Sequence, residues 1–264
     1  MDIENNSFAH PDFYLLTAEE AGKDIKIEQV KEMAKQAAFA PVLSEHKVCI
    51  IDDAGHMTAE AANSLLKLLE EPPPGWLFIL ITQQAERLLP TVLSRVVRLR
   101  FDAPDSSAVQ QILKAKGITQ NTQVLAALAG GSPGRALSYN QADIFAIRRE
   151  ALDLLKKLPL QNPFGYIAAL GWGEKYDRAA ALLLTEQFIY LLRDVLLLQS
   201  GAGGQVYNTD IMAGLDGIAA DWPLHTARQG VNAAQEAWQN INKNVSAKNV
   251  LEALVLKLDL LRKE

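Results

Sequence analysis

The sequence is poor in cysteine and carries no excess of positive charge, and each shortage excludes a class of protein. Cys49 is the single cysteine among 264 residues, so the chain can form no internal disulfide and no cysteine-based zinc cluster. It lies within an apolar run, which predicts a buried, reduced thiol. The formal net charge is −5, so no overall basic surface indicates nucleic-acid binding. Any contact with DNA must therefore be local or supplied by partners.

Long apolar runs are also missing. The most apolar later stretch, residues 179–198, is interrupted by Glu186, Arg193 and Asp194. Its uncharged pieces fall far short of the roughly 20 residues that a helix needs to cross a bilayer. The N-terminus is polar and acidic, unlike a secretory signal. We therefore expect no contact with a membrane and a cytoplasmic location.

Several catalytic motifs do not occur in the sequence. The four histidines are scattered, and neither HExxH nor GxSxG is present, so we expect no metal site. A phosphate-binding loop, GxxxxGK followed by Ser or Thr, is not found either. In the first hundred residues the Gly-Lys pair is Gly22-Lys23, with Thr17 in place of the first glycine and Asp24 in place of the hydroxyl. We interpret it as a turn and expect no tight nucleotide binding by this chain alone.

The most clearly organised stretch reads strand, helix, strand. Lys47–Ile51 is a short apolar run followed by Asp52 and Asp53, and Trp76–Thr82 is a second apolar run that ends on a hydroxyl. This order predicts a parallel sheet with a right-handed crossover. Ligands of such sheets gather at the carboxyl ends of the strands, where Asp52, Asp53 and Thr82 stand.

The segments around this unit are also well marked. Thr58 is a good N-cap for the intervening helix, and three prolines from Pro72 onward end it. The apolar stripe of the helix consists of Ala62, Leu65, Leu66 and Leu69. Val96–Phe101 alternates apolar and basic residues, which predicts a third strand with one exposed face.

These motifs resemble a known family. IIDDAGHMTAEAANSLLKLLEEPPP is similar to the Walker B strand and following helix of the AAA+ clamp-loader subunits of bacterial DNA polymerase III, the delta-prime and gamma/tau subunits. FILITQQAERLLPTVLSR resembles their sensor 1 strand and serine-arginine-cysteine segment. Further matches are HPDFYLL, GGSPGRAL and NKNVSAKNVLEALVLKL, so the resemblance covers most of the chain. The chain is identified as a delta-prime-type member that lacks the N-terminal P-loop segment.

The resemblance implies a fold of three parts. Residues 1–103 are expected to form an α/β AAA+ core with an N-terminally truncated parallel sheet, residues 104–142 an all-α lid, and residues 143–264 an all-α collar bundle for oligomerisation. The helical pattern of the last part predicts these helices: Asp143–Leu158, Pro163–Leu170, Lys175–Ser200, Thr209–Ala219, Leu224–Asn240 and Ser246–Arg262.

Ser94 and Arg95 match the family's serine-arginine pair at the subunit boundary. There the arginine reaches the γ-phosphate of ATP held by the neighbouring subunit. A guanidinium is always charged and forked, which suits it to stabilise transferring phosphoryl oxygens, and it can act in trans without a P-loop in its own chain. Val96 replaces the family's cysteine. The alternative is that Arg95 forms an ordinary surface salt bridge.

Asp52, Asp53, Thr82 and Arg135 match the Walker B, sensor 1 and sensor 2 positions. We expect this cofactor-binding set to be degenerate, because Asp53 replaces the glutamate that orients the attacking water and is one methylene shorter. The resemblance therefore implies that this chain binds no cofactor and that the neighbouring subunit holds ATP and magnesium. Alternatively, the two aspartates cap the strand and turn, and Arg135 is a helix-surface arginine.

By resemblance, the chain assembles with gamma/tau and delta subunits and helps to load the sliding clamp onto primed DNA during replication, as a stator and as the donor of Arg95. This places it in the DNA polymerase III holoenzyme, a DNA-directed DNA polymerase and thus a nucleotidyltransferase, with no ATPase or polymerase activity expected of the chain itself. Two alternatives stay open: a gamma/tau-type ATPase subunit and a non-functional truncated remnant.

Overall fold

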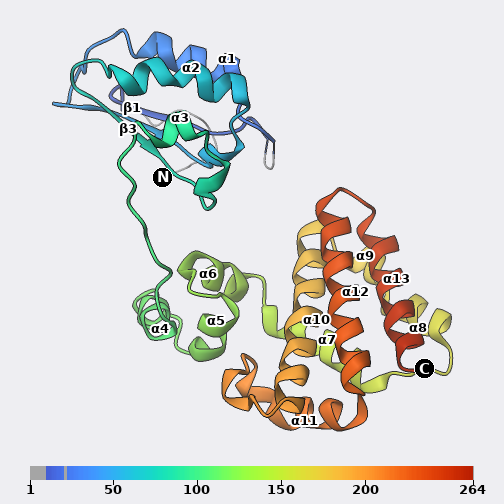
Figure 1. The fold of residues 1–264 in the computed structure, drawn as a ribbon. Helices are drawn as coiled ribbons and strands as arrows, with labels where there is room; N and C mark the ends of the chain where they lie inside the picture. Colours follow the sequence, from blue (N-terminus) through green and yellow to red (C-terminus); the bar gives the residue numbers. More distant parts are fainter. Residues whose placement is uncertain (1–9, 21–22, 264) are drawn as a thin grey trace. The chain divides into compact units, whose positions relative to one another are not determined.

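The chain divides into two compact units, one ending at Phe101 and one beginning at Asp102. The computed structural model describes residues 10–20 and 23–263, so Gly22 of the expected turn and the first residues of the expected 1–103 domain lie outside the described residues. The first unit is α/β, and the described part of the second contains helices and their connections (Figure 1). The expected division at residues 103 and 142 stays a prediction.

The first unit contains a parallel sheet of three strands. The order across the sheet is β1 (Phe13–Leu16), β2 (Lys47–Ile51) and β3 (Trp76–Leu80). Helix α1 (Ile27–Gln36) connects β1 to β2, and α2 (Ala59–Glu70) connects β2 to β3. The two helices lie side by side over one face of the sheet (Figure 1). The predicted strand–helix–strand unit is thus confirmed.

The start of α2 follows the sequence, and its packed face does so in part: Leu65 and Leu69 of the predicted stripe pack in the core of this unit together with Ala61 and Leu68, which the stripe did not include. The Thr58 side chain accepts a hydrogen bond from the Ala61 backbone N–H at 3.2 Å, as a good N-cap does. The apolar side chains of α1 and α2 are buried against one face of β1 and β2. The core of this unit includes Leu16, Val30, Met33, Cys49, Ile51, Ala61 and Leu65.

The buried thiol in β2 confirms the expectation for Cys49. Its side chain is free and buried, and burial raises its pKa to about 12 because the thiolate would have to give up water. A thiol with so high a pKa stays protonated and unreactive at neutral pH.

The third predicted strand, Val96–Phe101, is wrong. The segment lies outside the strands of the described sheet, and the side chains of Val97, Leu99 and Phe101 are 89%, 76% and 90% exposed. Alternating β-formers become a strand only when a neighbouring strand takes up their backbone hydrogen bonds. The alternation of apolar and basic residues indicates a preference for extended backbone, but no described strand pairs with this segment.

A buried carboxylate fixes the entry to β1. Asp12 accepts backbone hydrogen bonds from Val42, Leu43 and Ser44 at 2.6, 2.7 and 2.7 Å. Burial by itself would raise the pKa of Asp12, but these three N–H donors hold it below its usual value. The Asp12 carboxylate therefore ties the start of the sheet to the loop that precedes β2.

Three short helical segments follow the strands. The 3-10 turn η1 (Ala54–His56) comes directly after β2, and η2 (Ala85–Arg87) and helix α3 (Pro90–Leu93) come after β3. Pro90 stands at the first helical position of α3, where its missing N–H costs nothing. The predicted site residues of the first unit flank these segments: Asp52 and Asp53 precede η1, Thr82 precedes η2, and Ser94 and Arg95 follow α3.

The second unit opens with three helices that share one apolar cluster. They are α4 (Ser106–Ala115), α5 (Thr122–Leu128) and α6 (Pro133–Gln141). The Ser132 side chain accepts a hydrogen bond from the backbone N–H of Arg135 at 3.2 Å and so caps the start of α6. The cluster is built from Val109, Leu113, Val124, Leu125, Leu128, Ala136, Tyr139 and Ile144.

The remaining helices surround a larger core. The longest helices of this part, α10, α12 and α13, lie close together (Figure 1). The α-helices of this part are α7 (Ile144–Lys157), α8 (Pro163–Leu170), α9 (Trp172–Lys175), α10 (Arg178–Gln199), α11 (Met212–Asp221), α12 (Leu224–Asn242) and α13 (Ala247–Leu261). Two 3-10 turns, η3 (Gly203–Gln205) and η4 (Thr209–Ile211), lie between α10 and α11.

One predicted helix start in this region is wrong. Lys175–Ser200 was expected to be one helix, but Lys175 ends α9 and a new helix begins at Arg178. The Asp177 side chain accepts a hydrogen bond from the Ala180 N–H at 2.8 Å and caps that new start. Along the described ranges, none of the helices is both long and apolar enough to cross a membrane.

Candidate functional site

Three of the predicted site residues meet at the carboxyl ends of β2 and β3. Asp52 and Asp53 follow β2, and Thr82 follows β3. The two strand ends are held together because the backbone N–H of Ala54 donates to the carbonyl of Ile81 at 2.8 Å. The prediction that Asp52, Asp53 and Thr82 share one edge of the sheet is therefore correct, whereas their roles toward a nucleotide stay a prediction.

The carboxylate of Asp53 is engaged within its own loop. Its Oδ2 lies 2.8 Å from Nδ1 of His56, and Nε2 of the same ring lies 2.6 Å from Nη1 of Arg87. Asp53 has a left-handed backbone conformation with φ of +52°. This chain of three side chains holds η1 against η2. The sequence analysis singled out Asp53 for its place after β2, whereas nothing in the sequence pairs it with Arg87.

The side chains at this edge of the sheet contact residues of their own loops. The carboxylate of Asp53 contacts His56. Thr82 accepts a hydrogen bond from the N–H of Gln84 at 3.1 Å. A Cβ on Gly55 would lie 2.9 Å from the Thr82 hydroxyl, so the turn at Gly55 packs closely against Thr82. Across the described ranges, no group of three or more His, Cys, Asp or Glu side chains could hold a metal ion.

Ser94 and Arg95 directly follow α3, and Arg95 contacts Glu70, the last residue of α2. Nε of Arg95 donates to Oε1 of Glu70 at 2.7 Å, and Nη2 forms an ion pair with the same oxygen. Nη1 donates to the carbonyl of Thr91 at 2.8 Å and to Oγ of Ser94 at 3.1 Å. The guanidinium is thus fixed on both sides while 31% of the Arg95 side chain stays exposed.

Arg95 and the strand-end residues occupy opposite ends of α2. The helix begins beyond the carboxyl end of β2 and returns to the point where β3 starts. A helix of 12 residues is about 18 Å long at its usual rise per residue. Arg95, bound at Glu70, is therefore separated from Asp52 and Asp53 by about the length of this helix.

Arg135, the residue at the expected sensor 2 position, lies in a polar cluster inside the second unit. Its Nε donates to the hydroxyl of Tyr139 at 2.6 Å, and its Nη2 contacts both Glu186 and the hydroxyl of Tyr190, the latter at 2.9 Å. The Tyr139 hydroxyl also donates to Glu186. The cluster joins α6 to α10, and its guanidinium is engaged by three side chains.

Burial and charge shift the pKa values of this cluster in consistent directions. Burial would lower the pKa of Arg135, but the Glu186 carboxylate and the two tyrosine hydroxyls raise it overall. Burial and the hydrogen bond to Glu186 raise the pKa of Tyr139 well above its usual value. The cluster therefore holds one arginine cation, one carboxylate and neutral tyrosine hydroxyls. In the sequence, the signal for this cluster is limited to the four-residue spacing of Arg135 and Tyr139 on α6 and of Glu186 and Tyr190 on α10.

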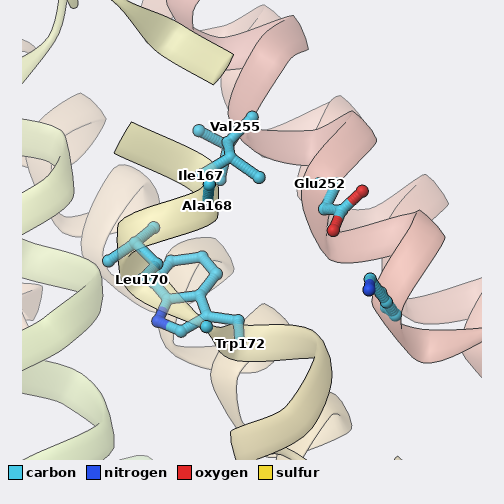
Figure 2. A pocket seen from close by; sticks show the side chains of 8 residues that line it. Ile167, Ala168, Leu170, Trp172, Glu252 and Val255 are labelled. Atoms are coloured by element: carbon cyan, nitrogen blue, oxygen red, sulfur yellow. The ribbon is translucent and has the colours of Figure 1, made fainter. Parts of the chain in front are cut away.

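A separate hollow lies among α8, α9 and α13, well away in sequence from every predicted site residue. Figure 2 shows Leu170 and Trp172 on one side and Glu252 and Val255 on the other. The hollow holds about 120 Å³ and is lined mainly by apolar atoms, with Lys248 and Glu252 on α13. That volume is far below the few hundred Å³ of a typical ligand pocket, so we do not assign it a ligand.

Comparison with known proteins gives matches along most of the chain. The family model described as "DNA polymerase III, delta subunit" matches residues 3–105. The DNA polymerase III subunit delta' of Bacillus subtilis is 28% identical over 252 residues, which cover 94% of this chain and 76% of that protein. The delta' subunit of Escherichia coli is 32% identical over 228 residues, which cover 85% of this chain and 65% of that protein.

More distant matches are found among related subunits. The DNA polymerase III subunit gamma/tau of Mycobacterium tuberculosis is 30% identical over 203 residues, which cover 66% of this chain and 34% of that protein. A crystal structure of a DNA polymerase III gamma subunit-related protein from Thermotoga maritima has a TM-score of 0.49 and 19% identity, covering 94% of this chain and 83% of that one. The chain thus spans about three quarters of the Bacillus relative and less than two thirds of the Escherichia relative.

Proposed function

We propose that the chain is a clamp-loader subunit of the DNA polymerase III delta-prime type that donates Arg95 to a neighbouring ATPase subunit; the match of the family model to residues 3–105 and the identities of 28% and 32% to two delta' subunits support this. In this proposal it assembles with gamma/tau and delta subunits, and the complex loads the sliding clamp onto primed DNA. The first unit serves as a degenerate AAA+ core, the helices up to residue 142 as a lid and the remaining helices as the collar that joins the subunits.

The observation that carries the proposal is the placement of Arg95. Its guanidinium is held rigidly at a partly exposed position and lies a helix length from the strand ends of its own sheet. An arginine that stabilises charge on another subunit's phosphate needs both properties, because it must be preorganised and must face outward. Ser94 supports this role by fixing Nη1.

We further propose that this chain holds no nucleotide of its own and acts as a rigid stator. Two observations support this. The 264 residues contain no GxxxxGK[ST] loop, and the carboxylate of Asp53 contacts His56. ATP and magnesium are then held by the neighbouring subunit, and the chain supplies a fixed cation to it. Polymerase and ATPase chemistry belong to other subunits of the assembly.

Replacing the guanidinium tests the proposal. Arg95→Ala in the complex with the cognate gamma/tau and delta subunits should leave the complex intact and slow its clamp- and DNA-stimulated ATP hydrolysis by about tenfold or more, since a finger supplied in trans contributes heavily to turnover. Arg95→Lys should rescue little, because an ammonium lacks the fork that matches phosphate oxygens. Unchanged hydrolysis in the Ala variant would refute the assignment of Arg95.

A binding measurement separates this proposal from a gamma/tau-type ATPase. The isolated chain should show no tight binding of ATP with magnesium in isothermal titration calorimetry. The cognate gamma/tau subunit serves as the positive control in the same buffer. Tight binding by the isolated chain would favour the ATPase alternative instead.

A further inference from the structure

Glu70 occupies the edge of the Arg95 guanidinium that an anion would use. A guanidinium has five N–H groups, and its Nε and Nη2 together form the flat edge that matches a carboxylate or a phosphate. Both of these nitrogens contact Oε1 of Glu70, while Nη1 is taken by Thr91 and Ser94. In this state the phosphate-binding edge of Arg95 is already filled by a carboxylate of its own chain.

The contact with Glu70 is one that an incoming anion can replace. The Glu70 side chain is 48% exposed and that of Arg95 is 31% exposed, so water reaches both partners. An ion pair of this kind contributes little net stability, because each charge is well solvated when the pair opens. Nη1 keeps its two bonds to Thr91 and Ser94 when the other edge is released, which leaves Arg95 anchored but available.

The position of Glu70 also makes its release inexpensive. Glu70 is the last residue of α2, and the C-terminal end of a helix disfavours a negative charge and favours a cation. Arg95 near this helix end is therefore attracted by the helix as well as by Glu70. When an anion draws the guanidinium away, Glu70 can turn to solvent without leaving a buried charge behind.

We propose that Glu70 is an autoinhibitory carboxylate that competes with the phosphate of a neighbouring subunit's nucleotide for the Nε–Nη2 edge of Arg95. This inference rests on the proposed function, because it assigns the regulation of the same arginine. Glu70 acts through Arg95 and is not itself in contact with the reacting atoms. Hydrolysis of ATP in the neighbouring subunit is favoured only when its phosphate displaces Glu70. Until then the Nε–Nη2 edge of Arg95 stays bound to Glu70.

The test uses charge removal at Glu70 in the assembled complex. Glu70→Gln keeps the size and a hydrogen-bond acceptor but removes the charge. We expect it to raise the kcat/KM of clamp- and DNA-stimulated ATP hydrolysis about two- to fivefold, the range that a partly exposed ion pair can supply. Glu71→Gln is the matched control, because Glu71 is adjacent and equally charged whereas the described hydrogen bonds of the Arg95 guanidinium go to Glu70, Thr91 and Ser94. It should leave kcat/KM unchanged.

A double variant shows whether the effect passes through Arg95. Glu70→Gln combined with Arg95→Ala should hydrolyse ATP at the rate of Arg95→Ala alone. If Glu70→Gln leaves hydrolysis unchanged or lowers it while Arg95→Ala still slows it, Glu70 is not a competitor and the inference fails by itself. If Arg95→Ala has no effect either, the proposed function fails. A gain from Glu70→Gln that persists in the double variant would also overturn the inference.

Discussion

Arg95 in the first unit and Arg135 in the second each contact a glutamate that is distant in sequence, yet the two glutamates have different surroundings. Glu70, the partner of Arg95, is 48% exposed and contacts the guanidinium from the end of α2. Glu186, the partner of Arg135, is 15% exposed and also accepts the hydroxyl hydrogen of Tyr139. Water can replace Glu70, but it cannot easily replace Glu186.

The difference indicates that Arg95 is available to bind an anion, whereas Arg135 stabilises the fold. Opening the first pair exposes two charges that were already partly solvated. Tyr139 is 1% exposed, and its hydroxyl donates a hydrogen bond to Glu186. Opening the second pair leaves this buried hydroxyl without its acceptor. We infer that Arg135 anchors α6 to α10, and its predicted sensor 2 role would require this cluster to come apart.

The largest expected effect on stability comes from breaking the Arg135 cluster. Glu186→Ala should lower the free energy of unfolding of the second unit by about 2 kcal/mol, because it leaves a buried hydroxyl and a partly buried cation unpaired. Urea unfolding followed by tryptophan fluorescence reports this unit, which contains Trp172, Trp222 and Trp238. Glu236→Ala is the control: its pair with Lys257 is mostly exposed, so its loss should change stability by less than about 0.5 kcal/mol. Equal losses of unfolding free energy in Glu186→Ala and Glu236→Ala would contradict the structural role assigned to the Arg135 cluster.

The smaller effect is expected at the first pair. Arg95→Ala should change the free energy of unfolding by less than about 1 kcal/mol, since the pair with Glu70 is partly exposed and its remaining bonds go to neighbours in sequence. Urea unfolding followed by circular dichroism is the measurement. A loss above about 2 kcal/mol would mean that Arg95 is a structural arginine, like Arg135, and would weaken its assignment as a finger.

Much of the first unit was predictable because local signals there agree with each other. Thr58 as a cap, the apolar stripe of α2 and the prolines after it define the helix, and the apolar runs on either side define β2 and β3. Val96–Phe101 failed because alternation shows a preference for a strand and says nothing about which strand would pair with it. The break before α10 was missed because a single cap at Asp177 interrupts an otherwise continuous helical pattern.

The partners of the two arginines could not be read from the sequence. Glu70 lies 25 positions from Arg95, and Glu186 lies 51 positions from Arg135. Periodicity identifies which face of a helix is polar, but it does not pair charges between helices. The resemblance located the arginines, and only the folded chain assigns each one a carboxylate.

Co-assembly tests the central claim, that the chain is a clamp-loader subunit, most directly. The purified chain would be mixed with the cognate gamma/tau and delta subunits and analysed by size-exclusion chromatography with light scattering. The account predicts one early-eluting complex of fixed stoichiometry that contains the chain. A sample that is monodisperse and unfolds cooperatively, yet elutes alone from that mixture, would contradict it.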